Sequence, residues 1–433
     1  MTKKGMLAII NNGIEFFIGS MLLILVTFMY SLEEAGAWIV FITLLFVGTK
    51  FREGITQTSL MKFSVGVSRE QRFSVYRISI LITIGIEGLL GGISALGAMF
   101  ISDEVLKVLL TNYLWLALPQ ALFRLFQFIS QSRLDVQSMI NSNVVLLNIM
   151  IMIWMYAYSA QLMLGQLPIV LGVAYWVGLC WQNLMHNTLS WPMHRSGLRL
   201  PEGYLNFAMN GLLRELFGTI SSRAYILFTA GLVGYTESAL VGIASRYANL
   251  IYLPNSAYQG LLYPKACELV QKGTTRAMFH FYRRALSWMQ AGFIPYVAVL
   301  ISFGSLGIVL LHGMEFIPAL PFFVVLIIAG AFISPYGHAF GSVCQAAGRP
   351  DLVTKLVLAN SVVNLLLSYI FIASLGVWGA VLAPIATDLA GLVAIQIILK
   401  RTFSSQLVES AATLSRRLTV LVRLLMKNTK KLA

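Results

Sequence analysis

Charged side chains are scarce in this chain. Asp, Glu, Lys and Arg together make up 11% of its 433 residues, and there are five histidines. A soluble globular domain carries about 25% charged residues, so that class is excluded. The sequence has neither a phosphate-binding G-x-x-x-x-G-K-[ST] loop nor a zinc-binding H-E-x-x-H motif, and its polar segments are too short for a nucleotide-binding domain. We therefore expect a protein that is not an enzyme, uses no cofactor and hydrolyses no ATP.

Cysteines are also few. The three present, Cys180, Cys267 and Cys344, are scattered over apolar stretches. Their spacing is not that of a metal site. We expect inert thiols packed among apolar side chains.

Long apolar runs fill the rest of the sequence, in which hydrophobic residues make up 58%. A transmembrane helix needs about 20 predominantly apolar residues, and about twelve such spans can be counted along the chain. They cover residues 6–30, 35–61, 75–101, 106–130, 138–162 and 167–190, then 204–231, 236–263, 278–304, 317–345, 353–374 and 377–399. We therefore predict an all-α polytopic membrane protein.

The second half of the chain resembles the first. Pro119, Arg133, Asp135 and Asn148 recur as Pro335, Arg349, Asp351 and Asn364, at an offset of roughly 216 residues, and Glu15 recurs as Glu215. We predict one bundle of about six helices over residues 1–195, a second over 196–400 and a tail over 401–433. Two similar membrane-embedded halves are typical of transporters with a substrate path between them.

Basic residues lie on one side of the predicted membrane. The loops after the even-numbered spans carry Lys62, Arg69, Arg72, Arg133, Arg195, Arg199, Lys265, Lys272, Arg276 and Lys355, and the opposite loops carry Glu33, Glu34, Asp103, Glu104, Glu237 and Glu315. This positive-inside pattern places both termini in the cytoplasm. The net charge of +14 then follows from topology and anionic lipids, so no nucleic-acid partner is expected. Leucines at helical spacing among basic residues in the tail predict an amphipathic helix on the inner leaflet.

Arginines inside the predicted spans are the first candidates for a binding site. A charge there costs roughly 2.5–3.5 kcal/mol and usually faces a cavity or a partner. Arg52 lies in the inner half of its span, and Arg223 and Arg246 lie in the outer halves of theirs, as in a ladder of cations. A guanidinium binds phosphate through paired hydrogen bonds, which suits a substrate with a pyrophosphate head. Arg214, nearer the cytoplasm, and Asn249, on the helix face of Arg246, complete the predicted substrate site.

The acidic residues allow other roles. Glu15 and Glu215 occupy equivalent positions in the two halves and are candidates for ion coupling, through a proton or a sodium ion. They would equally serve to neutralise an arginine. Internal ion pairs, of Arg52 with Glu53 or of Arg223 with Glu215, are the alternative to a substrate site.

Two further acidic features point to structure. A lone Glu87 inside its span is expected to bond a neighbouring helix. Arg133–Asp135 and Arg349–Asp351 occur in both halves, so we interpret them as loop clamps with the carboxylate near a helix start.

Two stretches of the second half carry a family resemblance. One is Gly242-Ile-Ala-Ser-Arg246-Tyr-Ala-Asn249-Leu, continuing through Pro254 to Tyr263-Pro264-Lys265, and the other is Ala346-Ala-Gly348-Arg349-Pro350-Asp351, followed by Asn360, Asn364 and Gly376. They resemble the Wzx-type polysaccharide flippases of the multidrug/oligosaccharidyl-lipid/polysaccharide (MOP) exporter superfamily. The resemblance covers nearly the whole chain in layout.

The resemblance implies a function. Such proteins move undecaprenyl-pyrophosphate-linked oligosaccharides across the bacterial inner membrane by alternating access, with polysaccharide polymerases or glycosyltransferases as further partners. Related lipid II flippases use a cationic central cavity, which Arg52, Arg223 and Arg246 would resemble. This chain lacks the two additional helices typical of those flippases, and it has Glu15 in its first span where they carry a cationic cluster.

Two other readings stay open. A cation-coupled drug or metabolite antiporter of the related MATE group would use Glu15 and Glu215 to expel organic cations. A non-transporting scaffold would recruit synthesis partners through the basic tail. An excess of arginine in the cavity favours the flippase, and an excess of acid favours the antiporter.

Overall fold

A computed structural model describes residues 3–64, 67–133, 135–186, 201–252, 254, 266, 268–270 and 275–404. These residues form helices and short connections, with no strand among them, which confirms the all-α fold class. The chain divides into two units, Met1–Ile220 (unit 1) and Ser221–Ala433 (unit 2), and each is described by itself. The domain boundary predicted at residue 195 and the amphipathic tail beyond residue 404 lie outside the described residues and stay predictions.

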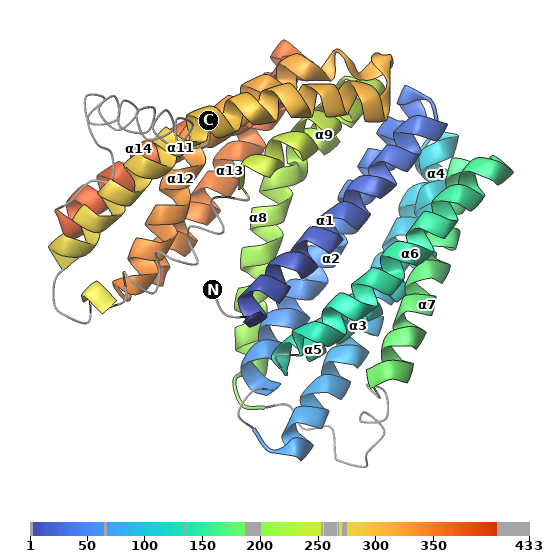
Figure 1. Cartoon of the computed structure of the whole chain (residues 1–433), viewed down its shortest axis with the longest axis horizontal. Coiled ribbons are helices and arrows are strands. Elements are labelled where there is room, and N and C mark those ends of the chain that lie inside the picture. The colour runs from blue at the N-terminus through green and yellow to red at the C-terminus, as the bar shows by residue number, and fades with distance from the viewer. Residues whose placement is uncertain are drawn as a thin grey trace, which may run out of the picture. The chain divides into compact units, whose positions relative to one another are not determined.

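Unit 1 contains a set of long helices joined by short connections (Figure 1). They are α1 (Lys3–Met29), α2 (Leu32–Ser64), α3 (Arg69–Ala98), α4 (Glu104–Thr111), α5 (Tyr113–Ser132), α6 (Val136–Ala160) and α7 (Leu167–His186), with a 3-10 turn at Leu164–Gln166. Helix α1 packs on α6, and α5 packs on α2, α3 and α7. The first turns of α8 (Tyr204–Leu232) belong to unit 1, where Tyr204 and Phe207 contact Phe63 of α2.

One predicted span of unit 1 is broken. Helices α4 and α5 together cover the span predicted at residues 106–130, and they meet at Asn112 with a bend of 45°. Asp103 caps α4 by accepting a hydrogen bond from the Leu106 amide at 2.7 Å. The Asn112 side chain donates to the carbonyl of Gly165 at 2.9 Å, so the break is tied to the turn before α7.

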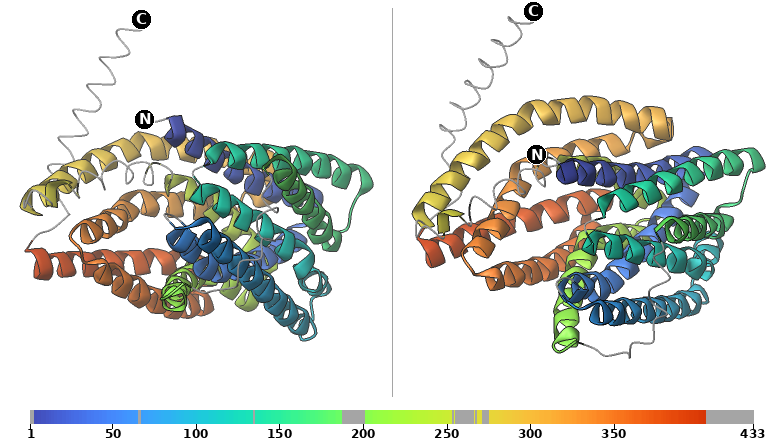
Figure 2. Two further views of the ribbon diagram at one scale, coloured as in Figure 1. Left: turned by 90° about the horizontal axis from the view of Figure 1, so that it is seen from below. Right: turned by 60° about the horizontal axis from the view of Figure 1, so that its bottom comes forward.

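Unit 2 contains the remaining helices. They are the C-terminal part of α8 from Ser221 onward, then α9 (Tyr235–Ala248), α11 (Thr275–His312), α12 (Ala319–Ala346), α13 (Pro350–Leu375) and α14 (Val377–Phe403), with 3-10 turns at Asn249–Ile251 and Met314–Phe316. At 38 residues, α11 is the longest described helix and is drawn in yellow in Figure 2. Helices α13 and α14 lie side by side, joined at Gly376, whose φ of 59° favours glycine.

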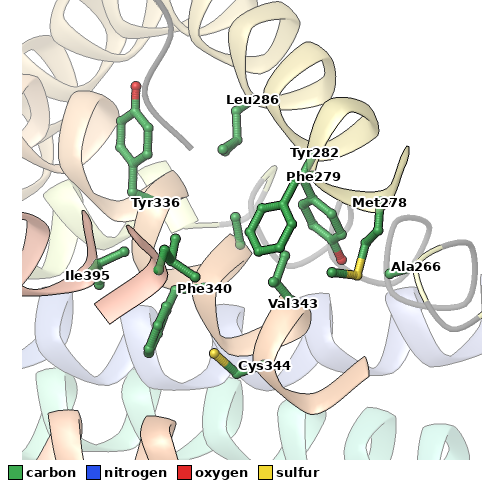
Figure 3. Close-up of a cluster of buried hydrophobic side chains, with 12 residues drawn as sticks. Ala266, Met278, Phe279, Tyr282, Leu286, Tyr336, Phe340, Val343, Cys344 and Ile395 are labelled. Carbon is green, nitrogen blue, oxygen red and sulfur yellow. The ribbon is translucent and has the colours of Figure 1, made fainter. Parts of the chain in front are cut away.

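The buried core of unit 2 lies at one end of α11 and α12 (Figure 3). Phe279 and Tyr282 of α11 pack against Phe340 and Val343 of α12, and Leu399 of α14 joins the same cluster. Cys344 is buried in this cluster as a free thiol, as expected, whereas Cys180 is exposed. The cluster ties three helices of the unit together.

Eight described helices or helix segments are long and apolar enough to cross a membrane, and the bent pair makes a ninth. They lie in α2, α3, α6, α7, α11, α12, α13 and α14. In α1 the apolar part is shorter, Gly13–Met29, and α8 carries Arg214, Glu215 and Arg223 among its apolar residues. By the length and composition of these helices the chain is a multi-pass membrane protein. Among the described residues helices lie at the predicted spans, although the span at 236–263 is described only as far as residue 252 and at residue 254, and the number that cross the membrane stays a prediction.

Candidate functional site

Glu15 of α1 is held by side chains from three helices of unit 1. Its carboxylate accepts hydrogen bonds from Arg124 of α5 at 2.5 Å, from Asn11 at 3.0 Å and from Asn143 of α6 at 3.2 Å. Asn143 also donates to Oδ1 of the Asn11 side chain at 2.9 Å. Both asparagines are 2% exposed, whereas the Glu15 and Arg124 side chains are 24% and 33% exposed. The ion pair is therefore accessible at one side and anchored at the other.

A second ion pair continues this arrangement on α2. Lys50 pairs with Glu53 at 2.8 Å, one turn away on the same helix. The charge of Glu53 also acts on Arg124. Glu15 and Arg124 thus form one ion pair between α1 and α5, and Glu53 and Lys50 form another on α2; we call these four residues the charge chain.

Arg52, one of the predicted substrate residues, lies elsewhere in unit 1. Its side chain is 3% exposed and pairs with Glu87 of α3, which is 1% exposed. The Tyr113 hydroxyl of α5 donates to the other Glu87 oxygen at 3.5 Å. A Cβ at Gly48 would lie 2.6 Å from that hydroxyl, so the glycine makes room for it.

The Arg52 pair answers two expectations from the sequence. The alternative of an internal ion pair holds for Arg52, but its partner is Glu87 of α3 and not Glu53, which binds Lys50. Glu87 does bond neighbouring helices, as predicted. Contact of Arg52 with a substrate stays a prediction, and in this conformation the pair is enclosed.

The two other candidate arginines both lie in unit 2. Arg223 lies on α8 and Arg246 in the last turn of α9, and their positive charges act on each other. Asn249 follows in the 3-10 turn after α9. Glu215 and Arg214 lie on α8 before the unit boundary, and the Arg214 side chain lies outside the described part of the chain.

Buried asparagines tie equivalent helices in the two units. Asn364 of α13 donates to the carbonyl and hydroxyl oxygens of Ser221 on α8, at 2.8 and 3.1 Å. In unit 1 the corresponding tie of α6 to α1 is made by Asn143. The residue that matches Asn364 in sequence is Asn148, which is exposed and donates to the Val144 carbonyl at 2.8 Å of its own helix.

Sequence reasoning missed Asn11 and Asn143. Asn11 lies four residues before Glu15, which places both on one helix face, so that signal was present. Asn143 gives no such signal, because its contacts to α1 span more than a hundred residues of sequence.

The loop motifs act differently in the two units. Asp135 caps α6 by accepting a hydrogen bond from the Ser138 amide at 3.1 Å, and Arg133 lies over the ring of Tyr76. In unit 2, Arg349 donates to both oxygens of Asp351 at 3.1 and 3.2 Å. These hydrogen bonds raise the pKa of Arg349 above its usual value. Both motifs clamp the start of a helix, as predicted.

Comparison with known proteins places the fold. No family model and no curated protein matches the sequence. An inward-facing multidrug resistance MATE transporter of the MOP superfamily has a TM-score of 0.72 at 14% identity, over 89% of this chain and 95% of that chain. The lipid II flippase MurJ, in an inward closed conformation, also has a TM-score of 0.72, at 15% identity over 96% of this chain and 90% of that chain.

The chain has the fold of MOP-superfamily transporters. An outward-facing MATE transporter matches at a TM-score of 0.62 and 12% identity, over 92% of this chain and 94% of that chain. At these identities the similarity extends to the fold, and it favours neither the multidrug nor the lipid-flipping branch.

Proposed function

We propose that this protein is a flippase of the bacterial inner membrane. Its substrate is an undecaprenyl-pyrophosphate-linked oligosaccharide, an O-antigen or exopolysaccharide repeat unit, which it moves from the inner to the outer leaflet by alternating access. The lipid tail stays in the bilayer while the pyrophosphate and sugars cross along a polar path. Polysaccharide polymerase or glycosyltransferases are its proposed partners.

One observation carries the proposal. Arg223 and Arg246 lie within successive apolar helices of unit 2. A charge inside a membrane span usually faces a cavity or a partner, and the phosphates of the substrate would be such a partner. A pyrophosphate suits the pair, because each guanidinium can bind two of its oxygens.

The other predicted residues take supporting roles in this proposal. Asn249, Arg214 and Arg52 are further candidates for substrate contact, and for Arg52 such contact requires its pair with Glu87 to open. Glu15 and Glu215 are the candidates for coupling to an ion gradient. The driving force is an ion gradient or the membrane potential.

Depletion in the native host tests the proposal. Undecaprenyl-linked oligosaccharide should accumulate in the cytoplasmic leaflet, and wild-type protein should relieve this accumulation whereas Arg223→Ala and Arg246→Ala should not. Arg401→Ala, at an exposed position in the last turn of α14, is the matched control and should restore transport. Full relief by both of the first two variants would contradict the arginine site.

A cation-coupled antiporter of the MATE type is the second candidate. The accessible Glu15 carboxylate of unit 1 favours it. Depletion would then leave the lipid-linked oligosaccharide unchanged and would lower resistance to cationic compounds. Glu15→Gln and Glu215→Gln would reproduce that loss.

A further inference from the structure

We propose that the charge chain of unit 1 is a second anion site, in which Arg124 binds the pyrophosphate of the lipid-linked substrate and Glu15 is the counter-ion that the pyrophosphate displaces. The proposal rests on the proposed function and deepens it. It assigns a substrate-binding role to Arg124 and changes the role of Glu15 from ion carrier to competitor of the substrate.

Accessibility distinguishes Arg124 from the other paired arginine of unit 1. The Arg124 side chain is 33% exposed and its partner Glu15 is 24% exposed. For Arg52 and Glu87 the values are 3% and 1%. A ligand can therefore approach the Arg124 pair directly, whereas the Arg52 pair is enclosed by helix packing.

The contact geometry leaves room for exchange. Nη1 of Arg124 meets one oxygen of Glu15 at 2.5 Å, so the pair is joined through one nitrogen and one oxygen. A guanidinium has five N–H donors in a fork that matches phosphate in a bidentate way. Exchanging Glu15 for a phosphate would thus replace a single contact with a paired one.

Glu15 keeps its other partners when Arg124 turns away. Breaking a buried ion pair is costly mainly because it leaves a charge without compensation. Here the Asn11 and Asn143 amides donate to the Glu15 carboxylate at 3.0 and 3.2 Å. These two buried asparagines are placed to stabilise the released carboxylate.

The rest of the charge chain supplies a second cation. Without a ligand, two cations and two carboxylates balance each other, which suits a site within the membrane. A pyrophosphate carries at least two negative charges, and Arg124 alone offers one positive charge. Lys50, whose side chain is 28% exposed beside Glu53, is the second cation of the site.

Binding of a synthetic polyprenyl pyrophosphate to the full-length protein in nanodiscs tests the assignment. Arg124→Ala should weaken binding roughly tenfold to a hundredfold, as expected for one lost charge-assisted contact. Arg124→Lys keeps the charge but lacks the forked guanidinium, so its affinity should lie between those of the wild type and Arg124→Ala. Glu15→Gln should tighten binding several-fold, because the amide oxygen still accepts from the asparagines but holds the guanidinium less strongly.

Arg349→Ala is the control. It removes an arginine from an exposed ion pair in a loop of unit 2 and should leave the affinity unchanged. Measurements in nanodiscs with and without phosphatidylglycerol show whether the site prefers a pyrophosphate to an ordinary anionic lipid head group. If phosphatidylglycerol competes as well as unlabelled polyprenyl pyrophosphate does, the substrate assignment is overturned.

The outcomes separate this inference from the proposed function. If Arg223→Ala weakens binding while Glu15→Gln and Arg124→Lys leave it unchanged, the charge chain is structural and the inference fails alone. If wild-type protein does not bind the polyprenyl pyrophosphate, the proposed function fails too. Tetraphenylphosphonium is an organic cation. If Arg124→Ala strengthens its binding, the carboxylates form a cation site, and both this inference and the proposed function fail. Where Arg124→Ala does not fold, Glu15→Gln and Arg124→Lys decide the matter.

Discussion

Arginines within the helices of this protein differ mainly in their surroundings. Arg52 is enclosed with Glu87, and Arg124 is partly exposed beside Glu15. Arg223 and Arg246 act on each other. Removing a guanidinium should therefore affect stability in the first case and substrate binding in the other two.

Stability is the property expected to depend on Arg52. Arg52→Ala leaves the Glu87 carboxylate buried and uncompensated, which should lower the free energy of unfolding by about 3–5 kcal/mol. Replacing both partners, as in Arg52→Met with Glu87→Leu, should cost less, because no buried charge remains. Arg349→Ala, at a pair whose side chains are 47% and 44% exposed, should leave the free energy of unfolding almost unchanged, because an exposed pair contributes little. Thermal unfolding of the purified variants measures all three, and equal losses for Arg52→Ala and Arg349→Ala would contradict the argument.

Candidate residues could be found from the sequence, but their partners could not. A charge in an apolar run is visible by inspection, so Glu15, Arg52 and Arg124 stand out. The contact of Arg52 with Glu87 joins residues 35 positions apart, and that of Arg124 with Glu15 joins residues 109 apart. Such contacts depend on how the helices pack, which hydropathy and spacing do not encode.

At the scale of the helix, apolar runs in the sequence predict where helices lie, but they do not predict where a helix is broken. Where the structure describes the predicted spans, they coincide with helices, because each run is long and apolar. The break at Asn112 was not predicted, since the run on both sides of it is apolar and the determining bond goes to the distant Gly165 carbonyl. Likewise, the sequence repeat pairs Asn148 with Asn364, but it is Asn143 that bonds α6 to α1 as Asn364 bonds α13 to α8.

Close packing at the start of α14 gives a prediction for this scale. A Cβ at Gly379 would lie 2.1 Å from the Phe371 carbonyl oxygen of α13, and a backbone atom cannot turn aside as a side chain can. Gly379→Ala should lower the free energy of unfolding by about 1–3 kcal/mol through overpacking. Gly341→Ala in α12 is the control, because nothing lies within 4 Å of its Cβ position and alanine favours helix. An unchanged melting temperature for Gly379→Ala, measured by thermal unfolding, would show that the two helices separate without cost.

At the scale of the whole molecule, the proposed direction of transport depends on topology. The positive-inside pattern predicts that both units begin on the cytoplasmic side. Exposed positions on opposite sides are available in each unit: Glu33 and Gln131 in unit 1, and Glu315 and Lys355 in unit 2. Single cysteines can be placed there after Cys180, Cys267 and Cys344 have been replaced by serine.

Labelling of these cysteines with a membrane-impermeant maleimide in intact spheroplasts tests the topology. Glu33→Cys and Glu315→Cys should be labelled from outside, and Gln131→Cys and Lys355→Cys only after lysis. The same result in both units is required of a parallel repeat, in which each half starts on the same side. If the units gave opposite results the repeat would be inverted, and if both were reversed the charge chain of unit 1 would lie nearer the outer leaflet. In that case Arg124 would meet the substrate at release instead of at loading.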